Sequence, residues 1–212
     1  MSLTLLTGFL LVMLLTYVVP GPDFAIVLRY ATRSRRAGRL AAAGVLTGVC
    51  LHATAAALGL SALLAKSATA FMVVKVVGAA YLLFLGAQAL WSSRRGAPRS
   101  APAPVEDGTR DRRAFVQGFL TNASNPKAML FFVSLLPQFI SDGMPVLPQT
   151  LLLGLITVAF GIVWWGLFVV LADRIRGFLG RPAVRRVLDR VTGVAFIGLG
   201  IRLLRTPAAA AT

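Results

Sequence analysis

Hydrophobic residues in this 212-residue chain are grouped in long runs and do not alternate with polar residues. Six runs occur, and most are close to the ~20 residues that an α-helix needs to cross a bilayer. Because lipid offers no partners for backbone N–H and C=O groups, each run is predicted to be a transmembrane helix. The runs are Leu3–Leu28, Arg39–Leu64, Ala68–Trp91, Ala114–Ile140, Leu147–Ala172 and Val191–Leu204. The predicted fold class is an all-α integral membrane protein with six transmembrane helices.

Composition supports a membrane protein and narrows its chemistry. The chain is 57% hydrophobic and 14% charged, and its mean hydropathy is +0.79, which is atypical of a soluble domain. One cysteine, Cys50, excludes an internal disulfide and any multi-thiolate metal site. The single histidine, His52, argues against the usual transition-metal cluster, so we expect no metal site and no cofactor. The first run has no basic segment before it and is expected to be retained as a span.

The basic residues lie mainly in alternate connections between the runs. Of the 22 Lys and Arg residues, 17 fall in the first, third and fifth connections, in the ranges 29–39, 92–113 and 174–190. The net charge of +15 is therefore interpreted as topogenic charge facing the cytoplasm, and no nucleic acid is expected as a partner. The positive-inside rule then places both termini outside, although Arg202 and Arg205 weakly oppose this orientation.

Two short matches indicate that the chain consists of two similar halves. Gly8-Phe9-Leu10 in the first run matches Gly118-Phe119-Leu120 in the fourth, and residues 75–81 match residues 190–196. An odd number of spans in each half inverts the second half relative to the first, as in many secondary transporters. The predicted divisions are a first three-helix repeat (1–92), a Pro-containing flexible cytoplasmic linker (93–113), a second three-helix repeat (114–206) and a disordered tail (207–212).

The first run is interrupted by Pro20, Gly21 and Pro22, which are followed by Asp23 and Phe24. The two prolines remove backbone donors, and the glycine permits backbone conformations that a helix does not use. A continuous helix therefore cannot pass through this segment. A carboxylate at a break inside a membrane segment is by default a candidate functional group.

The corresponding interruption in the second half lies in the fourth run, where Asn122, Asn125 and Pro126 precede Lys127. Paired interruptions in corresponding spans are the best sequence indicator of a transporter's binding site. The start of each half-helix offers amide donors that favour a carboxylate, and the freed carbonyls accept from an ammonium group. Such a site suits an amino-acid zwitterion, with Asp23 attracting the ammonium or carrying a proton and Lys127 attracting the carboxylate.

Structural roles for the same residues remain open at this point. Asp23 could only cap the half-helix that follows Pro22, with Lys127 as its fixed partner, and the two asparagines could only bind between helices. Counting at about 1.5 Å per residue places Lys127 near the membrane middle and Asp23 nearer the cytoplasm. A direct contact between the two charges is therefore a prediction to check.

Other residues within the runs have weaker functional interpretations. His52 suits packing or a pH-dependent role, and Trp164 and Trp165 suit packing or the lining of a pocket. Gly44 and Gly48 form a GxxxG motif, which permits close helix approach inside the fold or in a homodimer.

Taken as an ordered set, the motifs resemble the LysE/RhtB family of amino-acid exporters. The resemblance rests on Pro20-Gly21-Pro22-Asp23, on Gly78-Ala79-Ala80-Tyr81-Leu82 with Leu85-Gly86, and on Asn125-Pro126-Lys127-Ala128 with Phe131-Phe132. It implies a six-span protein of the bacterial inner membrane that exports amino acids or close derivatives in exchange for protons.

The predicted function is a secondary transporter in the lipid bilayer that exports a small amino acid by proton antiport and alternating access. The predicted substrate-binding or coupling residues are Pro20, Gly21, Pro22, Asp23, Phe24, Asn122, Asn125, Pro126 and Lys127. The alternatives are a metal-ion exporter, which the scarcity of Cys and His disfavours, and a non-transporting accessory protein. No enzyme is expected, because Asp23 is the only clear acid within the membrane runs.

Overall fold

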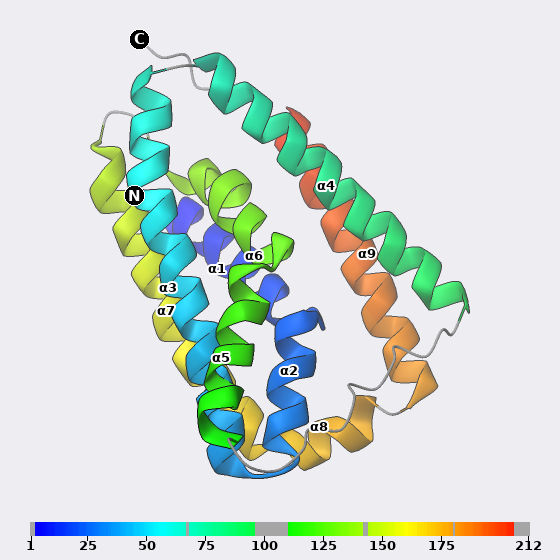
Figure 1. Ribbon diagram of the computed structural model, residues 1–212. Coiled ribbons are helices and arrows are strands. Elements are labelled where there is room, and N and C mark those ends of the chain that lie inside the picture. Colours follow the sequence, from blue (N-terminus) through cyan, green and yellow to red (C-terminus); the bar gives the residue numbers. More distant parts are fainter. Residues whose placement is uncertain (1–2, 67, 96–109, 142–143, 180, 206–212) are drawn as a thin grey trace.

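The computed structural model describes residues 3–66, 68–95, 110–141, 144–179 and 181–205, and all regular structure in those ranges is helical. The helices pack as an elongated bundle, in which α4 and α9 lie side by side along one flank (Figure 1). The elements are α1 (Leu3–Val18), α2 (Pro22–Ala31), α3 (Arg35–Lys66), α4 (Ala68–Arg95), α5 (Arg110–Ala123), α6 (Pro126–Leu130), the π-helix η1 (Phe131–Leu135), the 3₁₀-helix η2 (Leu136–Phe139), α7 (Val146–Val170), α8 (Ala172–Leu179) and α9 (Pro182–Arg205).

Each predicted run coincides with helical structure, although two regions differ from the prediction. Helix α9 begins at Pro182 and not at Val191, so the sixth run was predicted too short. The amphipathic α8, which lies across one end of the bundle in Figure 1, was not predicted, because arginines interrupt its apolar pattern. Helices α4 and α5 leave only residues 96–109 of the predicted linker between them, and these lie outside the described residues, as do residues 206–212.

The distribution of side chains is that of a bundle embedded in lipid. On α7, Leu155 and Val163 are 66% and 70% exposed, whereas Thr150 and Thr157 on the same helix are 0% and 2% exposed. Apolar groups therefore face outward and polar groups face inward. Within the described residues, Arg35–Gly59 and Val146–Val170 are each long and apolar enough to cross a membrane, and α1 with α2 makes a third candidate if the bent pair is one span. The full set of six spans stays a prediction.

The predicted break in the first run is confirmed as a bend of 57° between α1 and α2. Pro20 has no N–H group and cannot donate to the carbonyl of Thr16, four residues earlier. Gly21, the N-cap residue of α2, has φ −137° and ψ −168°, an extended conformation that any residue adopts. Space is what favours glycine here, because an added Cβ would lie 3.3 Å from Nζ of Lys127.

The fourth predicted run is also broken, and into more pieces than the sequence indicated. Helix α5 ends at Ala123, and α6 begins at Pro126 with Asn125 as its N-cap residue. The backbone then changes to π-helix in η1 and to 3₁₀-helix in η2. Pro137 cannot donate to the carbonyl of Val133, so an α-helical pattern cannot continue through this segment.

Small residues allow α3 and α5 to approach each other closely. A Cβ on Gly44 would collide with the backbone carbonyl of Phe115, and a Cβ on Gly118 would collide with the backbone carbonyl of Ala41. A Cβ on Gly48 would lie only 2.8 Å from Cβ of Asn122. The GxxxG motif therefore makes a contact inside the fold, which is one of the two roles that the sequence left open.

Replacing Gly44 with alanine is expected to destabilise the folded chain by about 1–3 kcal/mol, because the added methyl group must displace the backbone of α5. Gly59→Ala on the same helix is the matched control, since no heavy atom lies within 4 Å of its added Cβ. The control should keep or raise stability by up to about 1 kcal/mol through helix propensity. Thermal unfolding in detergent measures both variants, and equal melting temperatures would contradict the described contact.

Candidate functional site

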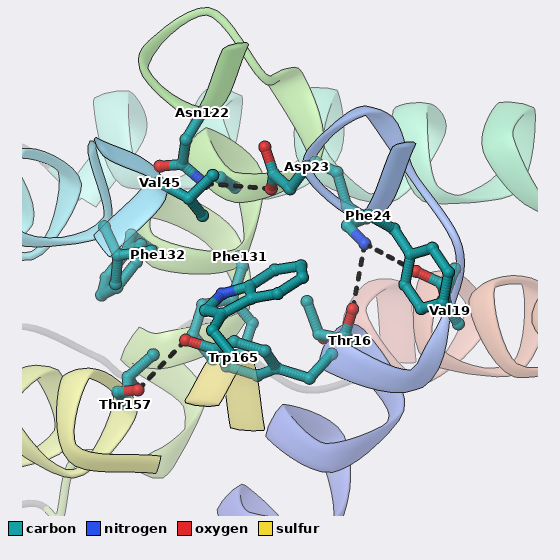
Figure 2. A pocket seen from close by; sticks show the side chains of 14 residues that line it. Thr16, Val19, Asp23, Phe24, Val45, Asn122, Phe131, Phe132, Thr157 and Trp165 are labelled. Carbon is teal, nitrogen blue, oxygen red and sulfur yellow. Dashed lines mark hydrogen bonds between the residues drawn. The ribbon is translucent and has the colours of Figure 1, made fainter. Parts of the chain in front are cut away.

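A cavity of about 50 Å³ lies where the two interrupted helices meet α3 and α7. Figure 2 shows side chains that line it, among them Asp23, Phe24 and Asn122 from the predicted site. Lys127 also lines the cavity. The remaining wall is largely aromatic and aliphatic, and includes Tyr17, Val45, Val49, Phe131, Phe132 and Trp165. Small-molecule sites usually measure ~300 Å³ or more, so this cavity, as it stands, has room for only a few water-sized groups.

Asp23 is the second residue of α2 and is only 8% exposed. Its Oδ2 accepts hydrogen bonds from Nδ2 of Asn122 at 3.0 Å and from Nδ2 of Asn125 at 2.9 Å. The N-terminal end of α2 also favours a negative charge through the helix dipole. Its Oδ1 is buried and has no hydrogen-bond partner among the described residues. A buried carboxylate oxygen without a donor is costly, so Oδ1 is the atom at which a proton or a donor group is most stabilising.

Lys127 is the second residue of α6, where Asn125 accepts a hydrogen bond from its backbone N–H at 3.0 Å. Its side chain reaches across to α1, and Nζ donates to the carbonyls of Thr16 at 2.9 Å and Val19 at 3.2 Å. The carbonyl of Thr16 is the one that Pro20 leaves without a helical donor. The ammonium group therefore lies at the carboxyl end of α1, where the helix dipole favours a positive charge.

Each interruption thus supplies hydrogen-bond partners to the other. The first presents Asp23 to asparagine amides of the second, and the second presents Lys127 to carbonyls of the first. In these hydrogen bonds Lys127 binds backbone carbonyls of the first interruption. Both asparagines do bind between helices, as the structural alternative expected.

The predicted residues differ in how they contribute to the cavity. Four line it directly, namely Asp23, Phe24, Asn122 and Lys127. Asn125 holds Asp23 and caps α6, whereas the prolines and Gly21 shape the two breaks. Phe24 packs edge-on against Phe168, with ring centroids 4.4 Å apart.

Sequence reasoning missed most of the wall contributed by α1 and α7. Tyr17 donates a hydrogen bond to the carbonyl of Thr157 at 3.1 Å. Trp165 is 3% exposed and lines the cavity, so pocket lining, one of its two sequence interpretations, is confirmed. Tyr17 and Thr157 are polar residues in apolar runs, which was the available signal, but only the packing shows which side of each helix faces the cavity.

The charges that line the cavity are one acid, Asp23, and one base, Lys127. Their formal charges cancel, which lowers the cost of burying both in an apolar surrounding. Within the described part of the chain, no three His, Cys, Asp or Glu side chains gather into a group that could hold a metal ion.

Comparison with known proteins places the chain in a family. The model of a family described as "LysE type translocator" matches residues 14–206. The threonine efflux protein of Escherichia coli (strain K12) is 32% identical over 186 residues, which cover 87% of this chain and 90% of that protein. A homoserine/homoserine lactone efflux protein of Salmonella typhimurium is 32% identical over 161 residues, 76% of each chain.

An uncharacterized membrane protein of Bacillus subtilis is 28% identical over 191 residues, which cover 87% of this chain and 91% of that protein. No solved structure matches the chain. The family match extends from α1 to the end of α9 and includes both interruptions and the cavity that they line. The resemblance inferred from the motifs is therefore confirmed, and this chain belongs to the LysE type translocator family, whose members are transporters and not enzymes.

Proposed function

We propose that this protein exports a small neutral amino acid and that the cavity between the interrupted helices is its substrate site. The observation that carries the proposal is that both interruptions contribute to one cavity, the first a carboxylate and the second an ammonium group. Two of the relatives are named for the efflux of threonine and of homoserine. These two amino acids are therefore the first substrates to test.

The balance of charge at the cavity favours a zwitterion. Asp23 and Lys127 already compensate each other, and a zwitterion adds no net charge to them. A cationic amino acid such as lysine would bring an unpaired charge into an apolar site, at a cost of several kcal/mol. The aromatic side chains of Phe131, Phe132 and Trp165 suit a short side chain better than a long charged one.

Asp23 is the proposed coupling residue for proton antiport. Its Oδ2 accepts two amide donors, whereas its Oδ1 is buried without one. A proton on Oδ1 would neutralise the carboxylate and leave both asparagine contacts in place. The ammonium group of a substrate could stabilise the same oxygen. Competition of a proton and a substrate for one atom is the simplest arrangement that exchanges them.

The proposed transport cycle is alternating access between two inverted repeats, residues 1–92 and 114–206. In support, α2 and α6 each begin with a proline that is followed by a charged second residue, Asp23 or Lys127. Because the cavity is smaller than a usual ligand site, the proposal includes a separation of the interrupted helices when substrate enters. Helices of the two proposed repeats pack against each other in pairs, since α3 lies along α5 and α4 lies along α9.

The proposed location is the bacterial cytoplasmic membrane, with both termini outside. The end of α2, the starts of α3 and α5 and the short α8 gather at one end of the bundle (Figure 1). This end carries arginines of the first, third and fifth connections, which favours its placement in the cytoplasm. Residues 93–113 are proposed as a cytoplasmic linker, and residues 207–212 as a tail.

Asp23→Asn and Lys127→Ala are each expected to reduce threonine or homoserine efflux by more than about tenfold, because each removes a charged hydrogen-bonding group at the cavity. Efflux is measured from loaded cells at equal membrane abundance. Asp111→Asn is the matched control, since Asp111 forms an exposed ion pair with Arg36 (2.7 Å) whose loss should cost under about 1 kcal/mol. Unchanged efflux in both site variants would reject the cavity as the substrate site.

Substrate charge provides a second test. In proteoliposomes, unlabelled threonine or homoserine is expected to compete with labelled threonine at least about tenfold better than lysine does, because the cavity charges are already balanced. Equal competition by lysine would show that the site accepts an added positive charge and would reject the neutral-substrate proposal.

Topology can be measured with reporter fusions. Alkaline phosphatase, which is active only outside the cytoplasm, should be active when fused after the last residue of the chain. The same reporter inserted within residues 96–109 should be inactive, because that segment is proposed to face the cytoplasm. The reverse pattern would contradict the proposed orientation.

A further inference from the structure

Pro126 leaves one carbonyl of α5 without its usual helical donor. In a continuous helix the N–H of residue 126 would bond to the carbonyl of Asn122, but proline has no N–H group. That carbonyl instead lies 3.0 Å from Nε2 of His52, on α3, and also accepts from the backbone N–H of Asn125 at 2.9 Å. A carbonyl oxygen only accepts hydrogen bonds, so Nε2 of His52 carries the hydrogen in this contact.

The His52 ring packs against an aromatic side chain of η1. Its face stacks on Phe132, with ring centroids 6.3 Å apart and an interplanar angle of 18°, and Phe132 is 2% exposed. One helical turn earlier, Gly48 provides the space for the Asn122 side chain, since a Cβ there would lie 2.5 Å from Oδ1 of Asn122. One face of α3 therefore offers Asn122 both a gap for its side chain and a donor for its carbonyl.

Asn122 connects His52 to the charged site. Its carbonyl accepts from His52, and its side-chain Nδ2 donates to Oδ2 of Asp23 at 3.0 Å. Both groups belong to the last turn of α5, immediately before the break. A shift of the carbonyl away from His52 would therefore also move the amide that holds Asp23.

We propose that His52 is a positioning residue for transport: its Nε2–H group holds the Asn122 carbonyl, which Pro126 deprives of its usual helical donor, and thereby directs the Asn122 amide to Asp23. This inference rests on the proposed function of the cavity. Both the neutral Nε2–H tautomer and the imidazolium form supply the donor, so the role requires a donor at this place and not a change of charge. It parallels the first interruption, where Lys127 binds the Thr16 carbonyl that Pro20 leaves open.

Three substitutions at position 52 distinguish the effect of the hydrogen-bond donor from the effect of the imidazole ring. The amide nitrogen of glutamine lies as many bonds from Cβ as Nε2 of histidine, that of asparagine lies one bond closer, and leucine has no donor. His52→Gln should keep efflux within about twofold of wild type and leave its pH profile unchanged. His52→Asn and His52→Leu should lower the maximal rate about tenfold, as expected for the loss of one part-buried hydrogen bond. Cys50→Ala, at an exposed neighbour on α3, is the control with wild-type efflux expected.

A double-mutant cycle with Asp23→Asn tests the connection through Asn122. Because His52 acts on Asp23 in this proposal, His52→Leu should cause much less than a tenfold further loss in the Asp23→Asn background, measured as residual substrate counterflow. Equal additional losses in both backgrounds would overturn the proposal. So would a His52→Gln variant that is as impaired as His52→Asn at equal abundance and melting temperature. If the His52→Leu variant does not accumulate in the membrane, the comparison of His52→Gln with His52→Asn still tests the proposal.

Wild-type efflux of threonine and homoserine is measured first. A wild type that exports no amino acid overturns the proposed function, whereas an active wild type with His52→Gln equal to His52→Asn overturns only the role of His52.

Discussion

A lipid bilayer cannot supply hydrogen bonds to an open backbone carbonyl or to a buried charge, and the interruptions of this chain create both. The fold supplies partners to the Thr16 carbonyl and to one oxygen of Asp23 by exchange between the first and second halves. Lys127 binds the Thr16 carbonyl that Pro20 leaves open, and two asparagine amides bind the carboxylate of Asp23. Each interruption leaves backbone or charged groups that would be costly alone, and these groups bind the other interruption. The packing of the bundle centre depends on this exchange.

The close contact between α3 and α5 is what makes the exchange geometrically feasible. Glycines at positions 44, 48 and 118 let the two backbones approach, so that the end of α5 lies beside the first interruption. The same approach brings His52 within hydrogen-bonding distance of Asn122. Close packing also explains why the cavity is small, since the aromatic side chains of α7 and η1 fill most of the space between the breaks.

The cavity combines two charged side chains with a mostly apolar wall, which suits a transporter. Each charge is held by groups from the opposite half, so relative movement of the halves changes the surroundings of both at once. The walls are mostly uncharged and apolar, which restricts strong polar binding to Asp23, Lys127 and their partners. Membership of the LysE type translocator family agrees with this organisation of the cavity.

The sequence by itself determined the helical membrane fold and the positions of both breaks. Long apolar runs have few alternatives in lipid, and the prolines at positions 20, 22 and 126 act on the backbone locally. Asp23 and Lys127 could be identified because a charged residue within an apolar run is evident from a single sequence. The short α8 could not be identified, because its arginines resemble a polar connection.

Only the tertiary structure decided which groups bind each charge. Hydrogen bonds from Asn122 and Asn125 to Asp23, and from His52 to Asn122, join positions 99, 102 and 70 residues apart. Their geometry depends on how closely α3 approaches α5 and on the bend between α1 and α2. Trp165 and Thr157 face the cavity for the same reason, since the orientation of a uniformly apolar helix is set by its neighbours and not by its own pattern.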